Sequence, residues 1–410
     1  MGKNSIQEVL KRGVDKIYPS SESLEKLLKE KKIRLYLGID PTGSRFHLGH
    51  TIPLRKLQEF ADLGHEAILL FGTGTVLVGD PSQRGEARKR ITEADIQENI
   101  KTWKKQAEKV LDLSKVKIRQ NGDWLLKLTM KDFIEIASKI SAVQLFKRDM
   151  FQERLKRGDT VWAHETFYPL LQGYDSVALD VDLEIGGTDQ TFNMLIGREL
   201  LAKIRHKEKF VLTVPMILGT DGKPMSKSSG NCVWLDDPPS EMYGKLMSIP
   251  DEQINSYLEL VTNLTQKELR ESRALLPLER KKLLALSVTT MYHGKENAKQ
   301  AQEGFQNVVQ KKLPPPNTPE VTIDQKIFDR YHVPISGATI SQVVATSANI
   351  GTAEAVRRVI GGAVSVDNLK ITDPRAPFNN FNISEDHVLK VSRREYVRIK
   401  GKESNAKKVK

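Results

Sequence analysis

Residues 33–74 combine strand-like and helix-like patterns in an order that limits the fold more strongly than any other feature of the chain. The runs IRLYLGI (33–39) and EAILLFGTG (66–74) are both rich in strand-forming residues. Between them, HLGHTIPLRKLQEFADLG (47–64) has apolar residues at helical spacing and stops at a glycine. A strand, a helix and a second strand in this order predict an α/β fold with a parallel sheet.

The flanking segments continue this alternation of patterns. Residues 5–31 predict one or two short amphipathic helices, and residues 124–157 are largely helical with mixed polarity. Apolar runs return at 176–185 and 209–218. Between those runs, residues 186–207 have the pattern of a helix that begins after a Gly-Gly turn. These patterns favour further strands and helices of the same α/β layer.

The second half of the chain has a different character. From Pro238 to Lys312 the pattern is almost entirely helical, and LPPPNTP (313–319) favours the extended polyproline geometry of a linker. Residues 331–410 mix short helices and strands, and they carry 13 Lys and Arg against 7 Asp and Glu. This block therefore holds half of the net charge of +12. Such a basic surface suits a polyanionic partner without proving one.

Length and composition exclude several classes of protein. The 410 residues predict two or three domains. Cys232 is the single cysteine, so an internal disulfide and a zinc site of several thiolates are excluded, and a reducing compartment such as the cytoplasm is favoured. No apolar run approaches 18 residues, which excludes a membrane-spanning helix. The expectation is a cytoplasmic multidomain protein without a membrane partner.

The segment PTGSRFHLGH (41–50) joins the first predicted strand to the following helix. His47 and His50 are three residues apart, so they share one face of the first helical turn, where free N–H groups and the positive dipole end lie. Gly49 leaves room for a flat base beside the backbone. The segment predicts a site for a nucleotide phosphate. The alternatives are two surface histidines or a metal pair, and no further ligand at suitable spacing supports the metal.

The segment DGKPMSKSSGN (221–231) reads as a flexible loop around Lys227. A mobile loop with a lysine and hydroxyl groups can close over a triphosphate and neutralise charge that develops in the transition state. An ordinary solvated turn is the alternative for this segment alone. The patterns GxxxxGK[ST] and GxGxxG after a strand are both absent, so a nucleotide is not expected to bind in either of those ways.

Taken together, these two segments resemble the HIGH and KMSKS signatures of class I aminoacyl-tRNA synthetases. The sequence His47-Leu48-Gly49-His50 matches the first signature with Leu in place of Ile. Residues 224–228 (PMSKS) match the second signature except at Pro224, where the family usually has Lys; Lys223 lies one residue upstream. The pair of signatures, in this order, is far more specific than either segment alone.

Four further segments resemble the tyrosyl-tRNA synthetase family, and the resemblance covers nearly the whole chain. They are YLGIDPT (36–42), TVLVGDPS (75–82), YPLLQGYDS (168–176) and GGTDQ (186–190). The resemblance implies a tyrosine site: Tyr36 and Asp175 at the phenol hydroxyl, Asp80, Tyr168 and Gln172 at the ammonium, and Thr75 and Gln190 nearby. A site that hydrogen-bonds a hydroxyl rejects phenylalanine, for which tyrosine enzymes are the standard example. Some relatives carry Gln where Glu184 stands, so Glu184 is left outside the predicted site.

The resemblance also implies a reaction in two steps. The carboxylate of tyrosine attacks the α-phosphate of ATP, and the tyrosyl group then moves from the adenylate to the terminal adenosine of tRNA(Tyr). Catalysis is expected from orientation and from charge stabilisation by His47, His50 and Lys227. The residues expected at ATP are Gly38, Asp40, Thr42, His47, Gly49, His50, Gly187, Asp189, Met225, Ser226, Lys227 and Ser228. ATP with Mg²⁺ is expected as a substrate, without a tightly bound cofactor or a metal held by the protein.

The resemblance divides the chain into functional parts. A Rossmann-like catalytic domain is expected at 1–235, with a helical insertion at about 124–160 that implies a homodimer. An α-helical anticodon-binding domain (236–312), a Pro-rich linker (313–330) and a small α+β RNA-binding domain with a basic tail (331–410) follow. In the last domain, residues 340–368 predict a helix, a turn, a helix and a hairpin. The expected RNA contacts are Arg357, Arg358, Arg393, Arg394 and Arg398.

Two rival functions share part of this pattern. The sister enzyme for tryptophan has the same fold and signatures, but Tyr36 with Asp175 and the basic C-terminal block argue against it. A non-catalytic RNA-binding protein on a synthetase scaffold is the second rival. The intact histidine pair and Lys227 argue against it, and Pro224 keeps it open.

Overall fold

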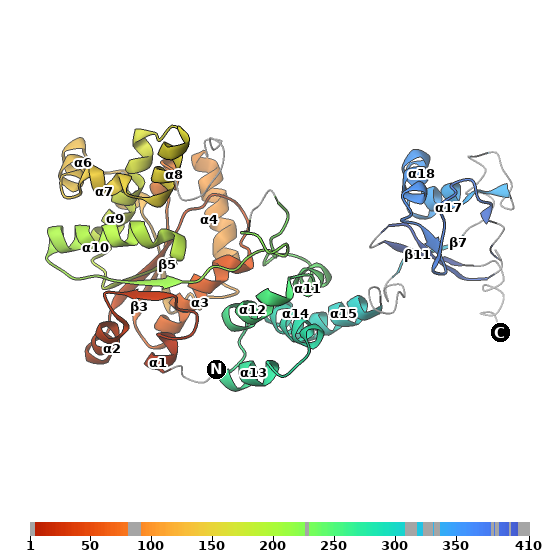
Figure 1. Cartoon of the computed structure of the whole chain (residues 1–410), viewed down its shortest axis with the longest axis horizontal. Coiled ribbons are helices and arrows are strands. Elements are labelled where there is room, and N and C mark those ends of the chain that lie inside the picture. The colour runs from red at the N-terminus through yellow and green to blue at the C-terminus, as the bar shows by residue number, and fades with distance from the viewer. Residues whose placement is uncertain are drawn as a thin grey trace. The chain divides into compact units, whose positions relative to one another are not determined.

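The computed structural model describes residues 5–80, 92–225, 229–307, 318–322, 331, 337–378, 381, 385–392 and 395–400. The chain divides into two compact units, residues 1–294 and 295–410. Each unit has its own sheet (Figure 1). Counted over the described residues, the first sheet has six strands and the second has five.

The sheet of the first unit is parallel apart from one edge. Its strand order is β1-β6-β5-β2-β3-β4, and only the edge pair β1–β6 is antiparallel. The strands are β1 Lys16–Tyr18, β2 Arg34–Ile39, β3 Glu66–Phe71, β4 Val116–Gln120, β5 Leu183–Gly187 and β6 Phe210–Val214. The prediction of an α/β fold with a parallel sheet is therefore confirmed.

Helices cover both faces of this sheet. Helix α3 (Leu48–Asp62) lies on one face, and α9 (Tyr168–Leu179) and α10 (Thr191–Arg205) lie on the other (Figure 1). Strand β2 lies between β3 and β5, so Tyr36 pairs with Ile68 on one side and with Glu184 on the other. Because the strands are parallel, the loops that follow β2, β3 and β5 meet at one edge of the sheet.

The remaining helices of the first unit connect the strands or follow the sheet. Apart from α3 and the insertion helices described below, four α-helices precede α9: α1 Ile6–Val9, α2 Ser21–Glu30, α4 Glu93–Ala107 and α5 Gly122–Leu125. The 3₁₀ turn η2 (Ala163–Thr166) lies directly before α9. Four helices follow β6: α11 Pro239–Met247, α12 Ile254–Val261, α13 Gln266–Ser272 and α14 Pro277–His293. Short 3₁₀ turns occur at η1 Thr75–Leu77, η3 Thr188–Gln190 and η4 Asp251–Gln253. The helical pattern after Pro238 is thus confirmed as far as it falls on these described helices.

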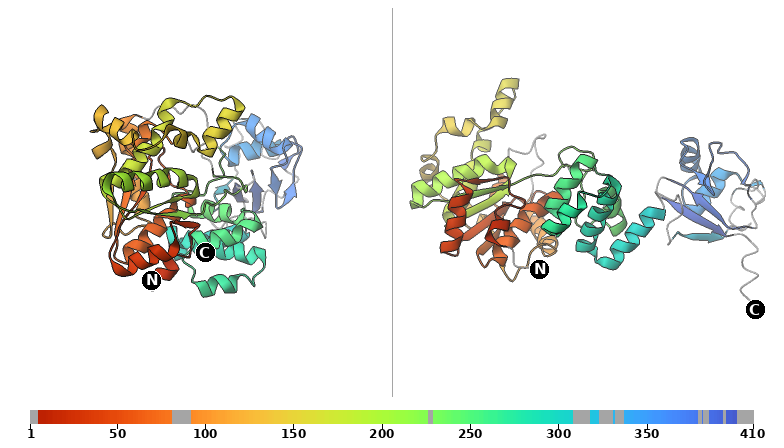
Figure 2. Two further views of the ribbon diagram at one scale, coloured as in Figure 1. Left: turned by 60° about the vertical axis from the view of Figure 1, so that its left-hand side comes forward. Right: turned by 60° about the horizontal axis from the view of Figure 1, so that its bottom comes forward.

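Three helices form the predicted insertion between β4 and β5. They are α6 (Met130–Ala137), α7 (Ala142–Phe146) and α8 (Asp149–Arg157), and they stand out from the unit on the side of α9 and α10 (Figure 2). Side chains of the insertion share one hydrophobic cluster with α9 and α10; its buried members include Ile136, Ile140, Leu145, Leu170 and Leu200. The insertion is therefore packed against the two helices that line the candidate site.

The N-terminal segment differs from its prediction in one respect. Residues 16–18, expected within or between short helices, form strand β1, which pairs with β6 at the edge of the sheet. Asp15 N–H donates to the Thr213 carbonyl, and Lys16 N–H donates to the Thr213 hydroxyl. A strand of three residues is too short to show a two-residue period, so its partner in β6 decides its structure.

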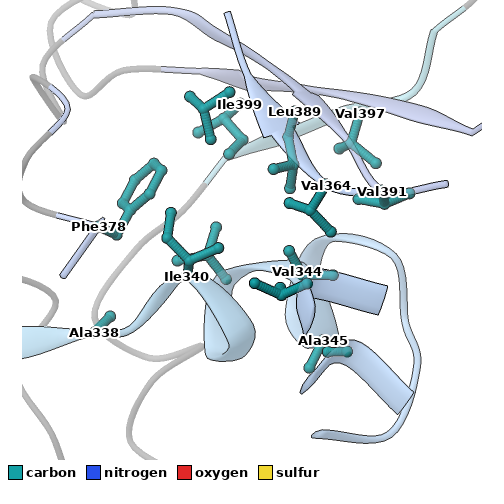
Figure 3. Close-up of a cluster of buried hydrophobic side chains, with 14 residues drawn as sticks. Ala338, Ile340, Val344, Ala345, Val364, Phe378, Leu389, Val391, Val397 and Ile399 are labelled. Atoms are coloured by element: carbon teal, nitrogen blue, oxygen red, sulfur yellow. The ribbon is translucent and has the colours of Figure 1, made fainter. Parts of the chain in front are cut away.

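The second unit contains an α+β core. Its described helices are α15 Lys295–Phe305, α17 Ile340–Ser347 and α18 Thr352–Ile360. Its sheet has the order β7-β11-β10-β8-β9, with β7 Glu320–Thr322, β8 Ser365–Val366, β9 Leu369–Lys370, β10 His387–Lys390 and β11 Tyr396–Lys400. Apolar side chains of α17 and the sheet, such as Ile340, Val344, Leu389 and Val397, form its core (Figure 3). The predicted helix, turn, helix and hairpin at 340–368 is confirmed.

Candidate active site

The structure brings a tyrosine and an aspartate together in the interior beside β2. The Tyr36 ring is fully buried and packs with Ile68, Leu70 and Trp124. Asp175 on α9 accepts hydrogen bonds from Trp124 Nε1 at 2.8 Å and from Asn121 Nδ2 at 3.0 Å. Burial raises the pKa of Asp175 well above its usual range, while these two donors lower it. A buried carboxylate with capacity to accept another hydrogen bond can bind a hydroxyl group.

Asp40, at the end of β2, connects residues that were predicted for two different ligands. Its Oδ1 accepts from the Thr75 hydroxyl at 2.7 Å, and its Oδ2 accepts from the Tyr168 hydroxyl at 2.9 Å. A Cβ on Gly72 would lie 1.9 Å from Asp40 Oδ1, so only glycine leaves room for this carboxylate. Asp40 therefore holds groups of the predicted tyrosine site at the place where the predicted ATP site begins.

Two of the described side chains contact Asp80, and one of them was not predicted. Gln190 Nε2 donates to Asp80 Oδ2 at 2.8 Å, as the predicted proximity of these residues requires. The unpredicted partner is Arg148, whose Nη2 donates to Asp80 Oδ1 at 3.5 Å; both side chains are 5% exposed. Arg148 comes from the insertion, immediately before α8, and lies over the rings of Phe151 and Phe192. No local sequence pattern distinguishes this arginine from the other charges of the insertion.

Gln172 lies next to the residue that the sequence analysis left out. Gln172 Nε2 donates to Glu184 Oε1 at 3.0 Å, and Glu184 also contacts the buried ammonium of Lys209. Within the described ranges, Gln172 Oε1 has no hydrogen-bond partner. This buried carbonyl oxygen is therefore suited to accept from an ammonium group. Glu184 and Lys209 belong to the surroundings of the site, and residue-by-residue resemblance gave no signal for Lys209.

The two histidines meet at the N-terminus of α3. His47 is the N-cap residue, its ring centroid lies 3.8 Å from that of His50, and its N–H donates to His50 Nδ1 at 3.1 Å. Both rings are half-buried. A Cβ on Gly49 would lie 3.0 Å from the His47 ring and 3.6 Å from Met225 Sδ, so the signature loop approaches this helix end. Backbone N–H groups and two imidazoles here can bind a phosphate.

The loop from 221 to 231 is described only in part. Ser226, Lys227 and Ser228, which were predicted at the phosphates, lie outside the described residues. At the base of the loop, Asn231 Nδ2 donates to Asp221 Oδ1 at 2.8 Å and to the Pro224 carbonyl at 3.1 Å. Leu218 and Pro224 form an isolated bridge. Asn231 therefore holds the two arms of the loop together below the signature residues.

Four other predicted ATP residues lie at the ends of β2 and β5. Gly38 lies beside Tyr36, and Thr42 N–H donates to the Asp40 carbonyl at 2.7 Å. A Cβ on Gly187 would lie 2.4 Å from Asp189 Oδ1, and Asp189 Oδ2 accepts from Gln190 Nε2 at 2.9 Å. Burial raises the pKa of Asp189. Gly38 and Gly187 lie at the carboxyl ends of β2 and β5, and Thr42 and Asp189 follow these strands, so all four lie at the carboxyl edge of the sheet.

The arginines predicted for RNA lie in the second unit. Arg357 pairs with Glu354, and Arg358 pairs with Glu354 and Glu395. Arg398 is on β11, and Arg393 and Arg394 lie outside the described residues. Arg357 remains 73% exposed, so its charge is available at the surface despite the ion pair.

Comparisons with known proteins agree on one family. Residues 28–310 match the family described as tRNA synthetases class I (W and Y). The tyrosine–tRNA ligase of Thermotoga maritima is 41% identical over 97% of this chain and 98% of its own length. Tyrosine–tRNA ligase 2 of Vibrio cholerae is 39% identical over 89% of this chain and 92% of its own.

Solved structures show the same fold. A C-terminally truncated mitochondrial tyrosyl-tRNA synthetase of Aspergillus nidulans has a TM-score of 0.64 at 24% identity and covers 75% of this chain and 95% of its own. The Archaeoglobus fulgidus tyrosyl-tRNA synthetase, solved with L-tyrosine, has a TM-score of 0.59 at 24% identity and covers 73% of this chain and 99% of its own.

Proposed function

This chain belongs to the class I tRNA synthetases of the tryptophan and tyrosine type, and we propose which of its residues carry out the reaction. It is a tyrosine–tRNA ligase that uses tyrosine, ATP and tRNA as substrates. The observation that supports the residue assignment best is the buried pair of Tyr36 and Asp175 beside an apolar wall. A phenol needs a hydroxyl partner and a carboxylate at this depth, and an indole has no hydroxyl to satisfy them.

We assign the ammonium of tyrosine to Asp80, Tyr168 and Gln172, with Thr75 and Gln190 holding the first two in place. Gln190 bonds Asp80, and Thr75 and Tyr168 both bond Asp40. The free carbonyl oxygen of Gln172 supports its part in this assignment. Arg148 joins the group as a structural partner of Asp80. In this assignment the Asp80 carboxylate lies between the Arg148 guanidinium and the tyrosine ammonium.

We propose that adenylate formation proceeds by positioning and charge stabilisation. The tyrosine carboxylate attacks the α-phosphorus, the bond to the β-phosphate oxygen breaks, and pyrophosphate leaves with the electron pair. The N-terminus of α3 with His47 and His50 is placed to bind the phosphates, and Lys227 supplies positive charge to the departing pyrophosphate. Gly187 and Asp189 are assigned to the ribose. We propose that Mg²⁺ arrives bound to ATP, because phosphate and water oxygens suit this ion.

ATP–pyrophosphate exchange with each amino acid in turn tests the proposal. Exchange that depends on tyrosine is the expected result. Exchange with tryptophan alone would favour the sister enzyme, and no exchange with any amino acid would favour an RNA-binding protein without catalysis.

We propose that the insertion forms a homodimer. Large apolar side chains remain exposed on it and on the segment that follows it: Met130, Ile134, Val143, Leu155 and Trp162 are 49% to 74% exposed. Exposed apolar side chains concentrated in one region typically mark a protein–protein interface. Sedimentation of the full chain at micromolar concentration tests this proposal, since a single monomer peak would contradict it.

We propose anticodon binding by 236–312 and further tRNA contacts by 331–410; the boundary between the two compact units, at 294/295, falls within the first of these ranges. Arg357, Arg358 and Arg398 are the described candidates for phosphate contacts in the second unit. Deletion of 331–410 is expected to leave pyrophosphate exchange within about twofold and to lower tRNA charging about tenfold at matched salt. Unchanged charging would contradict the RNA role of this block.

We propose a cytoplasmic location, because the substrates ATP and tRNA are found there and Cys232 is the single cysteine. Among the helices that the structure describes, none is long and apolar enough to cross a membrane.

A further inference from the structure

A buried ion pair lies directly behind the Tyr36 hydroxyl. Lys209, the residue before β6, is 0% exposed, and Glu184 on β5 is 2% exposed. Removing two charges from water is costly, and well-packed apolar side chains of similar volume often stabilise an interior at least as well. Stability alone therefore gives no reason for a charged pair at this position. We therefore expect this ion pair to have a role in the neighbouring tyrosine site.

Two helices leave a specific space for the lysine head group. A Cβ on Gly197 of α10 would lie 2.6 Å from Lys209 Nζ and 3.0 Å from Ser176 Oγ. A Cβ on Gly173 of α9 would lie 3.2 Å from the Gly197 Cα. The close approach of α9 and α10 at these glycines thus opens a path for the ammonium to reach Ser176, one residue after Asp175.

The hydrogen bonds along this path set the direction of each proton. Lys209 Nζ donates to Ser176 Oγ at 2.8 Å, and an ammonium can only donate. The single Ser176 proton must then point elsewhere, and Tyr36 Oη lies 3.0 Å away while Glu184 Oε2 lies 3.5 Å away. Glu184 accepts from Lys209 and Gln172, and it also lies close enough to the Tyr36 hydroxyl to help burial raise the pKa of Tyr36. Because Tyr36 Oη is nearer to Ser176 Oγ than Glu184 Oε2 is, the geometry favours donation from Ser176 to Tyr36.

We propose that Lys209 and Glu184 are positioning residues for tyrosine selection, which act through Ser176 on the Tyr36 hydroxyl. Glu184 holds the Lys209 ammonium against Ser176, and Ser176 donates to the Tyr36 oxygen. The Tyr36 proton can then be donated to the phenol oxygen of the substrate instead of to Glu184. The phenol proton is donated in turn to the Asp175 carboxylate. Each proton in this series of hydrogen bonds therefore has one acceptor.

This order of protons favours tyrosine over phenylalanine. A phenol both accepts from Tyr36 and donates to Asp175, whereas phenylalanine leaves both groups unpaired in the interior. Without the ammonium, Ser176 can accept from Tyr36 instead, and the Tyr36 proton is then turned away from the ligand. The inference rests on the proposed assignment of Tyr36 and Asp175 to the phenol hydroxyl.

Binding of two unreactive analogues, L-tyrosinol and L-phenylalaninol, tests the inference without requiring catalysis. Calorimetry on the full-length protein gives the ratio of their two dissociation constants. In Ser176→Ala and in the neutral double variant Glu184→Gln/Lys209→Met, the preference for L-tyrosinol is expected to fall about tenfold. The affinity for L-phenylalaninol is expected to stay within about threefold, because this ligand has no hydroxyl group on its ring to hydrogen-bond Tyr36 or Asp175.

A second buried lysine provides the matched control. Lys56 on α3 donates to the Val9 and Arg12 carbonyls, far in sequence from Ser176, so Lys56→Met tests the general cost of losing such a group. This control is expected to melt at a lower temperature with an unchanged ratio. A parental ratio in the folded Ser176→Ala protein, or in the folded double variant, would overturn the inference.

Comparison of the two analogues also tests whether Ser176 has a purely structural role. If L-tyrosinol and L-phenylalaninol lost affinity in parallel in the folded Ser176→Ala protein, Ser176 would support only the fold and the inference would be wrong. Failure of the proposed function gives a different result, since the parent protein itself would then show no tyrosine-dependent exchange.

Discussion

The two halves of the proposed active site, one assigned to tyrosine and one to the phosphates of ATP, are built in different ways. The tyrosine half consists of interior side chains, such as Tyr36 and Asp175, whose polar atoms already have partners in the protein. The phosphate half consists of the half-buried rings of His47 and His50 at a helix N-terminus, next to the signature loop. A choice between two similar amino acids needs fixed donors and acceptors in a dry interior. A charged triphosphate needs positive groups at a place that it can reach and leave.

Lys227→Ala is expected to give the largest effect and separates the two halves most sharply. The exchange rate at saturating substrates should fall about 100- to 1000-fold, because charge on the departing pyrophosphate loses its counter-charge. The dissociation constant of tyrosine should change by less than about twofold, since the tyrosine half is untouched. Pyrophosphate exchange at saturating substrates and equilibrium binding measure the two quantities. Turnover equal to that of the parent would remove Lys227 from the mechanism.

Tyr36→Phe probes the other half with a smaller expected effect. The variant keeps the ring that packs on Ile68 and Leu70 and loses only the hydroxyl. For tyrosine, kcat/KM in the exchange assay should fall about tenfold through loss of one buried hydrogen bond. The KM for ATP should remain near the parental value. A large change in the KM for ATP with intact tyrosine binding would show that the two halves are not independent.

Gly49→Ala is expected to affect only the phosphate half, and modestly. The added methyl group would lie 3.0 Å from the His47 ring, so this ring must shift by a few tenths of an ångström. The KM for ATP should rise about threefold to tenfold, because the phosphate-binding groups lose alignment. Tyrosine affinity, measured by calorimetry, should not change. An unchanged KM for ATP would place the nucleotide away from this helix end.

His65 provides the smallest expected effect and a control for His47 and His50, the two histidines proposed to bind the phosphates. It lies after the other end of α3, and burial lowers its pKa to about 4, with a further contribution from Lys32. The unfolded chain, with a pKa near 6.5, then binds more protons than the folded chain between these values. The stability contributed by neutral His65 is therefore complete above about pH 6.5 and is lost as the pH falls toward 4.

His65→Asn should remove this part of the pH dependence of the melting temperature, a difference of a few degrees. The asparagine oxygen can replace Nδ1 as acceptor of the Ile33 N–H. Thermal melts at pH 5 and pH 7.5 measure the effect, and exchange activity at pH 7.5 should remain that of the parent. If the melting temperature changed equally with pH in the parent and in His65→Asn, the pH dependence would not come from His65.

Sequence patterns predicted the parts of the fold that local rules control. The strand, helix and strand at 33–74 show a clear spacing of apolar residues and clear turn residues at their ends. The helix, turn, helix and hairpin at 340–368 do so as well. Strand β1 (Lys16–Tyr18) escaped prediction because three residues carry no period and only β6 makes them a strand. The position of Lys227 remains a prediction, since it lies outside the described residues.

The same contrast applies to the site. Residues inside a recognisable segment, such as Tyr168 and Gln190, were named by resemblance, and the structure brings them to the same carboxyl edge of the sheet. Arg148 and Lys209 were missed because each reaches the site from a distant part of the chain as a single side chain. Nothing in their neighbours along the sequence signals a buried partner. Tertiary packing alone places these two charges.

A crystal structure of the full-length protein with a non-hydrolysable tyrosyl-adenylate analogue tests the central claim most directly. The account predicts the phenol oxygen within about 3 Å of both Tyr36 Oη and the Asp175 carboxylate, and Lys227 within reach of the phosphate beside His47 and His50. A phenol ring bound elsewhere, or a Lys227 that cannot approach the phosphate in the bound state, would contradict it.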